Sequence, residues 1–354
     1  MYSATPGYVQ AGRYQGMHGM PKQWTAEDVG RLTRGFQQAA VVLAAAELDL
    51  FAVLASGAKT AAEVAAGLDA DLRGTAVLLD ALAAMGLLDK EGGSYAVPPA
   101  VADVLTEAGS HSMLRMTQHL ANCYRRWGDI AEAVKTGRPS ARRPSIRGDE
   151  GDRESFIGGM HDLAVATAPG LVAEMMPLGF RHLLDVGGGP ATWAIEFLKA
   201  VPDATATVFD LPPVVPLGKA RVEEAGLGDR VTFVEGDYNA DPLPCGADFA
   251  WVSAIIHQNS REENRALLAK VFDALVPGGQ VAIRDVVMEP SRTAPLAGAL
   301  FAVNMLVATR GGTFTFGEIR DDLEAAGFAD VMLARRDEAM NSIVTARKPK
   351  GGGT

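Results

Sequence analysis

The sequence has few cysteines and no long uninterrupted apolar run, and each shortage excludes a class of protein. Cys123 and Cys245 are its two cysteines in 354 residues. Two thiols cannot build a disulfide framework and supply too few thiolates for a zinc cluster, so we expect a reducing compartment and no metal site. No run approaches the roughly 18 apolar residues of a membrane span, and the N-terminus lacks the basic and apolar regions of a secretory signal. A cytoplasmic protein without a membrane partner is therefore predicted.

Basic residues are also in short supply. Lys and Arg number 33 against 43 Asp and Glu, which gives a net charge of −10. This balance argues against a general nucleic-acid or anionic-membrane partner. The 39 Gly and 19 Pro residues are too few for a low-complexity chain. The length leads us to expect two domains with real cores.

The N-terminal part of the chain is predicted to be helical and rich in Ala and Leu. Residues 1–23 show no apolar period and are expected to form an arm that is flexible or ordered by a partner. Within 24–107, helical patterns are followed by two short strand-like runs around Gly92 and Gly93. Helices followed by a hairpin are a winged-helix order. Residues 108–178 contain further helix and are expected to connect this domain to the next.

From 179 to 350, apolar strand-like runs alternate with helical stretches. The runs lie at 182–186, 205–209, 231–235, 248–256, 280–287, 328–335 and 341–346. Strands that alternate with helices imply βαβ units and a parallel sheet covered by helices on both faces. The last two runs are close together in the chain and are expected to pair antiparallel. The predicted fold class is therefore mixed, with an N-terminal helical domain and a C-terminal α/β domain with a mostly parallel seven-stranded sheet.

The strongest local signal is a glycine-rich turn, Gly187 to Gly189, between a strand-like run and a helical stretch. Glycines let a backbone turn tightly and approach a ligand, and a helix N-terminus offers free N–H groups; a plain strand-to-helix turn gives the same pattern. Asp210 ends the next run, where a carboxylate can accept both hydroxyls of a ribose. Asp237 follows the third run and could accept an adenine amine. Three successive strand ends thus carry groups suited to a nucleoside.

These motifs resemble the class I S-adenosylmethionine-dependent methyltransferases, and more narrowly the caffeic-acid and acetylserotonin type of small-molecule O-methyltransferase. They are Asp-Val-Gly-Gly-Gly at 185–189, Asp-Leu-Pro-Pro at 210–213, Gly-Asp-Tyr at 236–238 and Leu-Val-Pro-Gly-Gly at 275–279. The resemblance covers nearly the whole chain, because that family also has an N-terminal winged-helix-like dimerisation domain. It implies a Rossmann-like methyltransferase domain, S-adenosylmethionine rather than NAD as cofactor, S-adenosylhomocysteine as product, and a homodimer formed through 24–107.

The resemblance also assigns residues to the two ligands. The cofactor set is Asp185, Gly187, Gly189, Asp210, Leu211, Gly236, Asp237, Tyr238, Ser253, Phe156 and Met160. The acceptor set is Trp127, Gln258, Asn304 and Met305. A Met or Phe at helical spacing is more often core, but Asn304 is an amide inside an apolar helix and needs a partner if buried, which a substrate oxygen could be. An apolar pocket with a few polar groups would suit a flat aromatic or polyketide-like hydroxyl compound.

His257 is the catalytic candidate. Of six histidines it is the one at a predicted strand C-terminal end beside the cofactor crevice, directly after the run 248–256. A neutral imidazole there can take a hydroxyl proton near pH 7, although a packed or helix-capping histidine would fit the position equally well. The resemblance, in which this position is the general base of an SN2 methyl transfer, favours catalysis. Asp285 ends the next run and is expected to hold the imidazole tautomer; a cap beyond the sheet is the alternative.

Four residues, at three places in the chain, depart from the family pattern. The family has Asp-Trp after the histidine, where this chain has Gln258-Asn259. Plant members have a Glu after a later Gly-Gly pair, where this chain has Thr313. Ala191 stands where the family often has Gly, at the start of a helix. The first two changes remove carboxylates from the neighbourhood of the base and suggest a different acceptor.

Two other functions fit parts of the sequence. The first is a cofactor-binding relative with other chemistry, such as N- or C-methylation, decarboxylation or hydroxylation. The second is a winged-helix regulator with a ligand domain. Residues 30–100 carry five basic and eight acidic side chains. The helix expected at 72–86, with one Arg and one Asp, cannot neutralise the several phosphates that DNA binding requires.

Overall fold

The computed structural model describes residues 23–350, and the chain divides into two compact units. The first unit consists of the described residues up to Arg125 together with Arg142–Leu163, and the second of Arg126–Ala141 together with the described residues from Ala164 onward. The segment 108–178, expected as a connector, thus contributes to both units. The expected arm, 1–23, lies outside the described residues except for Gln23.

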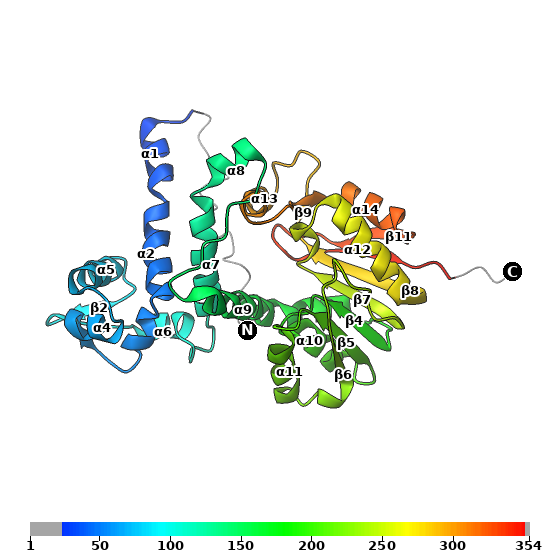
Figure 1. The fold of residues 1–354 in the computed structure, drawn as a ribbon, viewed down its shortest axis with the longest axis horizontal. Helices are drawn as coiled ribbons and strands as arrows, with labels where there is room; N and C mark the ends of the chain where they lie inside the picture. The colour runs from blue at the N-terminus through cyan, green and yellow to red at the C-terminus, as the bar shows by residue number, and fades with distance from the viewer. Residues whose placement is uncertain (1–22, 351–354) are drawn as a thin grey trace. The chain divides into compact units, whose positions relative to one another are not determined.

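The first unit is helical with one small sheet (Figure 1). Its helices are α1 (Ala26–Arg34), α2 (Phe36–Glu47), α3 (Leu50–Leu54), α4 (Ala61–Gly67), α5 (Leu72–Ala84), α6 (Pro99–Leu105), most of α7 (Leu114–Trp127) and the first part of α9 (Gly148–Met175). Its strands β1 (Lys59–Thr60), β2 (Asp89–Glu91) and β3 (Ser94–Ala96) pair antiparallel in the order β1-β3-β2. The hairpin turns at Gly92 and Gly93, both with positive φ. The expected order of helices and then a hairpin is therefore present.

The second unit contains the expected seven-stranded sheet. Its strands are β4 (His182–Val186), β5 (Thr205–Asp210), β6 (Val231–Glu235), β7 (Ala247–Ser253), β8 (Leu275–Asp285), β11 (Ala329–Arg335) and β12 (Ser342–Arg347). Their order is β11-β12-β8-β7-β4-β5-β6, and every pair from β8 to β6 is parallel. β12 pairs antiparallel with both β8 and β11. The order of the strands reverses between β4 and β7, which is where open α/β sheets bind ligands.

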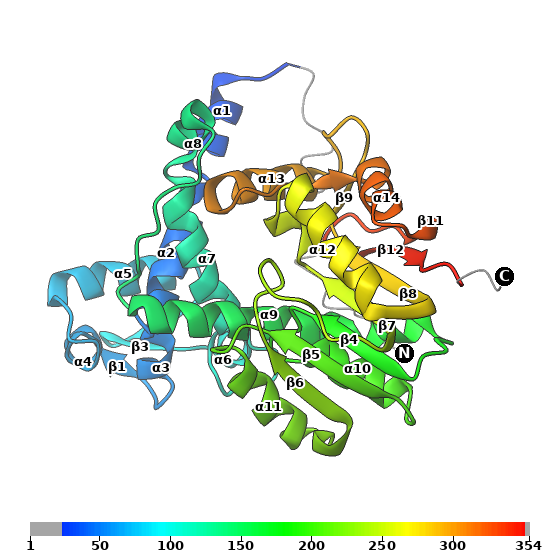
Figure 2. The ribbon, with the colours of Figure 1, turned by 45° about the vertical axis from the view of Figure 1, so that its right-hand side comes forward.

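Helices cover both faces of this sheet (Figures 1 and 2). They are α10 (Thr192–Ala200) and α11 (Val215–Glu224) on one face, and α12 (Arg261–Ala274) and α14 (Phe316–Ala325) on the other. Successive strand residues point to opposite faces, so Phe249 and Trp251 pack with α10 while Ala250 and Val252 pack with α12 and α14. Both faces are buried, which explains why the strands read as continuous apolar runs.

Shorter elements complete the second unit. They are α8 (Ile130–Thr136), the one-turn helices η2 (Gly228–Arg230) and η3 (Ile256–Gln258), α13 (Leu296–Ala308), and the two-stranded parallel pair β9 (Val287–Met288) and β10 (Phe314–Thr315). Several helices in both units begin with a capping box, in which a Ser or Thr and an acidic residue three positions later satisfy each other's backbone N–H groups. Thr60 with Glu63 begins α4, and Ser260 with Glu263 begins α12.

Two strand boundaries differ from the sequence expectation. The run 248–256 ends as a strand at Ser253, because Ala254 adopts a left-handed backbone with φ 58° and leaves the extended ladder. The run 280–287 begins earlier, at Leu275, and ends at Asp285. Val287 belongs to the separate pair β9–β10. Asp285 therefore ends its strand as expected, whereas His257 lies on η3, four residues beyond its strand.

Among the described residues, α9 is the one helix long and apolar enough, by length and composition alone, to cross a membrane. Its second half packs Ala164, Ala168, Leu171 and Val172 into the core of the second unit. A helix that contributes to a protein core meets the same compositional criterion.

Candidate active site

The glycine-rich turn between β4 and α10 is built on left-handed backbone. Gly187 has φ 65°, Gly189 has φ 54°, and Ala191, the N-cap of α10, has φ 60°. A Cβ on Gly187 would lie 2.5 Å from the Cδ1 atom of Ile255, so this turn also requires glycine for close packing. Alanine is strained in this conformation by roughly 1–2 kcal/mol. Ala191 is fully buried, so surrounding packing holds it there.

Asp210 ties this turn to the end of β5. Its Oδ2 accepts the N–H of Gly189 at 2.7 Å, and its Oδ1 accepts the N–H of Leu211 at 2.7 Å. Burial raises the pKa of Asp210, and the two N–H donors oppose that rise. Each carboxylate oxygen retains a lone pair after accepting one hydrogen bond. Asp210 can therefore hold the turn and still accept hydroxyl groups of a ligand.

Asp185, at the end of β4, is a buried carboxyl with little hydrogen bonding. Its side chain is 1% exposed, and neither oxygen forms a hydrogen bond of good geometry with the residues that the structure describes. Burial raises the pKa of Asp185 to about 7 and the neighbouring charge of Asp210 adds to this rise, whereas the nearby backbone N–H of Ala194 opposes it. A buried polar group that lacks good hydrogen bonds costs free energy. The arrangement is typical of a site that a cationic or hydrogen-bonding ligand completes.

The loop that follows β6 also lies beside the glycine-rich turn. The ring of Tyr238 lies beside the glycine-rich turn, since a Cβ on Gly187 would be 3.7 Å from its Cε1 atom. Burial, followed by the nearby charges of Asp237 and Asp210, raises the pKa of Tyr238 to about 12. The ammonium of Lys270 donates to the carbonyl of Tyr238 and to two further carbonyls of the same loop. Lys270 was not expected from the sequence, because a helical lysine gives no sign of a distant backbone partner.

Other residues assigned to the cofactor have internal contacts in the structure. The hydroxyl of Ser253 accepts a hydrogen bond from Nη1 of Arg284 at 3.1 Å. Arg284 is buried, and its guanidinium lies 4.7 Å from the ring centre of Trp193. A Cβ on Gly236 would lie 2.5 Å from the ring of Phe209, so this glycine allows close packing. The cofactor roles of Ser253 and Gly236 stay predictions.

The edge where β4, β5 and β6 end fits the expected cofactor. S-adenosylmethionine carries a positive sulfonium and a positive ammonium group, and the edge presents Asp185, Asp210 and Asp237. A Cβ on Gly189 would meet no atom within 4 Å, so open space lies against the turn. Leu211 is 46% exposed and offers an apolar contact next to Asp210. Charge, open backbone and a buried carboxyl with little hydrogen bonding therefore agree with a cationic nucleoside.

His257 and Asp285 form a buried pair. The Nδ1 atom of His257 lies 2.9 Å from Oδ1 and 3.0 Å from Oδ2 of Asp285, and the two residues are 6% and 2% exposed. The backbone N–H of Val286 also donates to Oδ1, at 2.8 Å. Because an ionised carboxylate only accepts, Nδ1 of His257 carries the proton, and Nε2 of the neutral ring is left as an acceptor. The ring of Phe301 on α13 packs edge-on against the imidazole, with centroids 4.8 Å apart.

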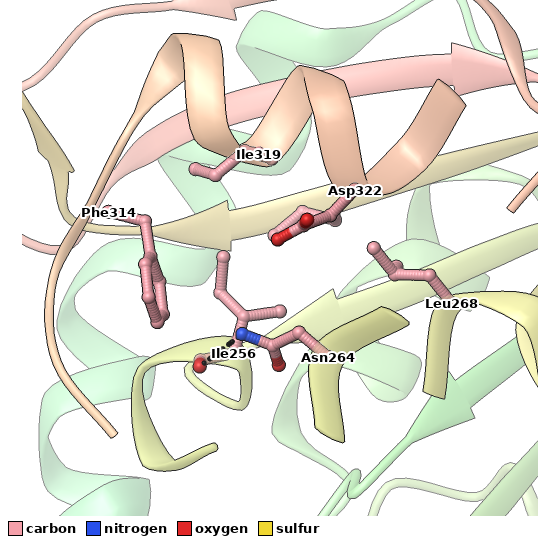
Figure 3. Close-up of a pocket in the computed structure, with 7 residues that line it drawn as sticks. Ile256, Asn264, Leu268, Phe314, Ile319 and Asp322 are labelled. Carbon is pink, nitrogen blue, oxygen red and sulfur yellow. Dashed lines mark hydrogen bonds between the residues drawn. The ribbon is translucent and has the colours of Figure 1, made fainter. Parts of the chain in front are cut away.

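The one-turn helix η3 that carries His257 is anchored from α12. The buried side chain of Asn264 donates from Nδ2 to the carbonyl of Ile256 at 2.9 Å (Figure 3). Figure 3 also shows Asn264 and Asp322 among the residues that line a small cavity. The volume of this cavity is about 10 Å³. The sequence offered one weak sign of this anchor, an amide among the apolar positions of α12. Its partner is a backbone carbonyl, which no sequence pattern identifies.

Two of the four residues predicted to bind the acceptor, Trp127 and Asn304, contact each other in the structure. The indole N–H of Trp127 donates to Oδ1 of Asn304 at 2.9 Å. Asn304 lies one helical turn from Phe301 on α13 and therefore on the same face as the ring that contacts His257. Met305 is buried, 5% exposed, and Gln258 folds back to donate to the carbonyl of Ala254. The roles of Met305 and Gln258 stay predictions.

Phe156 and Met160 lie on α9 in the first unit. Phe156 is 41% exposed, and its ring packs at 5.0 Å against the ring of His119. Their assignment to the cofactor stays a prediction.

Two of the residues that depart from the family pattern, Asn259 and Thr313, are buried. Thr313 is 4% exposed, and its carbonyl accepts a hydrogen bond from Arg292. Asn259 is also 4% exposed, and its amide nitrogen has no hydrogen-bond partner within residues 23–350. Neither residue brings a carboxylate to His257, whose carboxylate contact is Asp285.

Two sequence families match the chain. The O-methyltransferase domain matches residues 127–329, and the O-methyltransferase dimerisation domain matches residues 31–111. The chain is 34% identical over 323 residues to 3-hydroxy-5-methyl-1-naphthoate 3-O-methyltransferase of Streptomyces sahachiroi, covering 90% of this chain and 94% of that protein. It is 30% identical over 334 residues to human acetylserotonin O-methyltransferase, covering 89% of this chain and 95% of that protein.

Solved structures agree with these relatives. Human N-acetylserotonin methyltransferase in complex with S-adenosylmethionine has a TM-score of 0.77 at 29% identity, covering 93% of this chain and all of that chain. PigF with S-adenosylhomocysteine has a TM-score of 0.81 at 26% identity, covering 92% of this chain and all of that chain. The cofactor is therefore S-adenosylmethionine.

The raised pKa of Asp185, about 7, predicts a pH-dependent stability in the ligand-free protein. The folded state keeps this proton to about pH 7, whereas an unfolded aspartate loses it near pH 3.9. Asp185 therefore makes its full contribution to the free energy of unfolding below about pH 4 and loses it as pH rises through 7. The total loss is about 2–4 kcal/mol. Asp185→Asn should remove this slope, as thermal unfolding between pH 4 and 8 would measure. If the melting temperatures of the two proteins changed with pH in the same way, Asp185 would not be the source of the slope.

Asp210→Ala should raise the dissociation constant for S-adenosylmethionine at least tenfold. The variant removes the anchor of the Gly189 N–H and the carboxylate that is predicted to accept the ribose hydroxyls. Asp229→Ala is the matched control, because Asp229 is an exposed aspartate on η2, just before the N-terminal end of β6 and so away from the strand ends that carry the site. Isothermal calorimetry would compare the three proteins. Equal affinity in all of them would count against Asp210 as a cofactor ligand.

Proposed function

The chain belongs to the S-adenosylmethionine-dependent O-methyltransferase family, and we propose that it methylates a hydroxyl of a small aromatic or polyketide-like acceptor with His257 as general base. The observation that carries this proposal is the buried His257–Asp285 pair, which leaves Nε2 of the ring as a proton acceptor. When bound, the cofactor supplies a methyl group on a sulfonium sulfur, which an oxygen nucleophile can displace.

In this proposal His257 takes the proton of the acceptor hydroxyl on Nε2 as the oxygen becomes a nucleophile. Asp285 accepts from Nδ1, keeps the ring in this tautomer and stabilises the imidazolium that forms. Phe301 packs on the ring and restricts its orientation. Positioning of the two reactants supplies much of the remaining rate enhancement.

The Trp127–Asn304 hydrogen bond supports a specific kind of acceptor. An indole N–H can only donate, so the amide oxygen of Asn304 faces Trp127. The amide nitrogen is then left to donate, and an acceptor with a carbonyl or carboxylate oxygen near its hydroxyl would satisfy it. The relative from Streptomyces sahachiroi is named for a hydroxynaphthoate, which has both groups.

A homodimer through the N-terminal domain and a cytoplasmic location are parts of the same proposal. Four large apolar side chains on and around α1 are about half exposed, namely Trp24, Val29, Leu32 and Phe36. Apolar surface of this kind, in the region that matches a dimerisation domain, supports a second copy as its partner.

Transfer of a labelled methyl group from S-adenosylmethionine to a panel of phenols, catechols, hydroxyquinones and hydroxynaphthoates tests the function. Label should arrive on an oxygen. His257→Ala should reduce kcat by about 10²–10⁴ without loss of cofactor affinity, because the general base is removed. His182 is the first residue of β4, at the other end of that strand from the site. His182→Asn should therefore leave kcat unchanged. Wild-type turnover in His257→Ala would exclude the proposed base, and label on carbon or nitrogen would exclude O-methylation.

Asn304→Ala should raise KM by about 2- to 12-fold for an acceptor with a carbonyl near its hydroxyl, the effect of one lost neutral hydrogen bond, and by more for an acceptor with a carboxylate, which is charged. The effect should be absent for simple phenols. The affinity for S-adenosylmethionine serves as the internal control and should not change. A KM increase for simple phenols as large as that for these acceptors would contradict the proposed contact.

A further inference from the structure

Residues 309–313, between α13 and β10, pass directly against the backbone of His257. The N–H of Gly312 donates to the carbonyl oxygen of His257 at 2.9 Å. A Cβ on Gly311 would overlap that same oxygen and lie 2.6 Å from the carbonyl carbon of Gln258. This is far inside van der Waals contact, so the two backbones can approach so closely only if residue 311 has no side chain.

The segment is fixed where it leaves α13. The N–H of Gly311 donates to Oγ1 of Thr309 at 2.9 Å. Thr309 in turn donates from its N–H to the carbonyl of Met305, in the last turn of α13, at 2.8 Å. α13 also carries Phe301, which packs on the ring of His257. The same helix therefore reaches His257 at its ring and, through this segment, at its backbone.

The segment is also fixed at its other end. Phe314 pairs with Val287 in the parallel pair β9–β10, and Val287 follows Asp285 by two residues. β9 begins two residues after Asp285, and β10 begins directly after residue 313, so the pairing of β9 with β10 links the two segments through their chain neighbours. A shift of this segment would move His257 relative to Asp285.

We propose that Gly311 is a positioning residue for His257, because its missing side chain lets residues 309–313 hold the His257–Gln258 backbone at the distance that places the imidazole on Asp285. The inference rests on the proposed role of His257 as general base. In this proposal the Gly311-Gly312 pair positions His257 whatever residue stands at position 313. Thr313 can therefore replace the glutamate of plant relatives without loss of this contact.

The two glycines provide a matched pair of variants. Neither has positive φ, so alanine fits the backbone conformation of both. A Cβ on Gly312 meets no atom within 4 Å, whereas one on Gly311 overlaps His257. Gly311→Ala should lower kcat about 10²-fold, the effect of a misplaced catalytic group, with the dissociation constant for S-adenosylmethionine unchanged within twofold. Gly312→Ala should keep wild-type kcat. Equal kcat in the two variants would overturn the proposal.

A double variant separates positioning from general damage. If Gly311 acts through His257, then His257→Ala with Gly311→Ala should be no slower than His257→Ala alone. A further loss in the double variant would overturn the proposal. The single variant His257→Ala tests the proposed function itself. Wild-type turnover in that variant would contradict the role of His257 as general base, whatever the result for Gly311.

If Gly311→Ala does not fold, Thr309→Val tests the same positioning role of residues 309–313. This variant removes the acceptor of the Gly311 N–H and adds no bulk near His257. It should lower kcat several-fold with unchanged cofactor affinity and a cooperative thermal transition. Wild-type kcat in Thr309→Val would overturn the proposal.

Discussion

The parallel pairing of β4 with both β5 and β7 is the constraint on which the rest of the second unit depends. Parallel strands end at one edge, so the pairing brings together the groups that follow β4, β5 and β6 even though they are far apart in sequence. It also places two carboxyl groups, Asp185 and Asp210, in a buried region, where burial raises the pKa of both and the charge of Asp210 raises that of Asp185 further. Two buried carboxyl groups so close together cost free energy when charged, and a cationic ligand relieves that cost.

The second centre of the site, the imidazole of His257, depends on one strand. Asp285 reaches the ring through both carboxylate oxygens, so the tautomer is fixed without a carboxylate at position 258 or after Gly312. The departures from the family pattern therefore change the surroundings of His257 and not the contact that orients its ring. Three elements hold η3 from different sides: β8 through Asp285, α12 through Asn264, and the segment after α13 through Gly312.

The sequence predicted the elements and the strand-end residues well, because both follow from local patterns. The seven apolar runs correspond to the seven strands, and Asp210 and Asp285 end theirs as expected. The end of β7 could not be predicted, since apolar residues continue through Ile256 while the left-handed turn at Ala254 ends the strand. Contacts such as Asn264 to a carbonyl, or Gly311 against His257, involve backbone atoms of distant segments. Such partners have no side-chain signature in the sequence.

The division of the chain between the two units restricts how it can be dissected. Residues 126–141 belong to the second unit, yet in the chain they lie between two stretches of the first. The connection therefore crosses from one unit to the other three times, the last time inside the continuous helix α9. No single cut of the polypeptide separates the units: a fragment that starts at Ala164 would lack Trp127 and α8. The second unit is thus not a module that can be exchanged at one fusion point, because an exchange has to include residues 126–141 from the N-terminal side of Ala164.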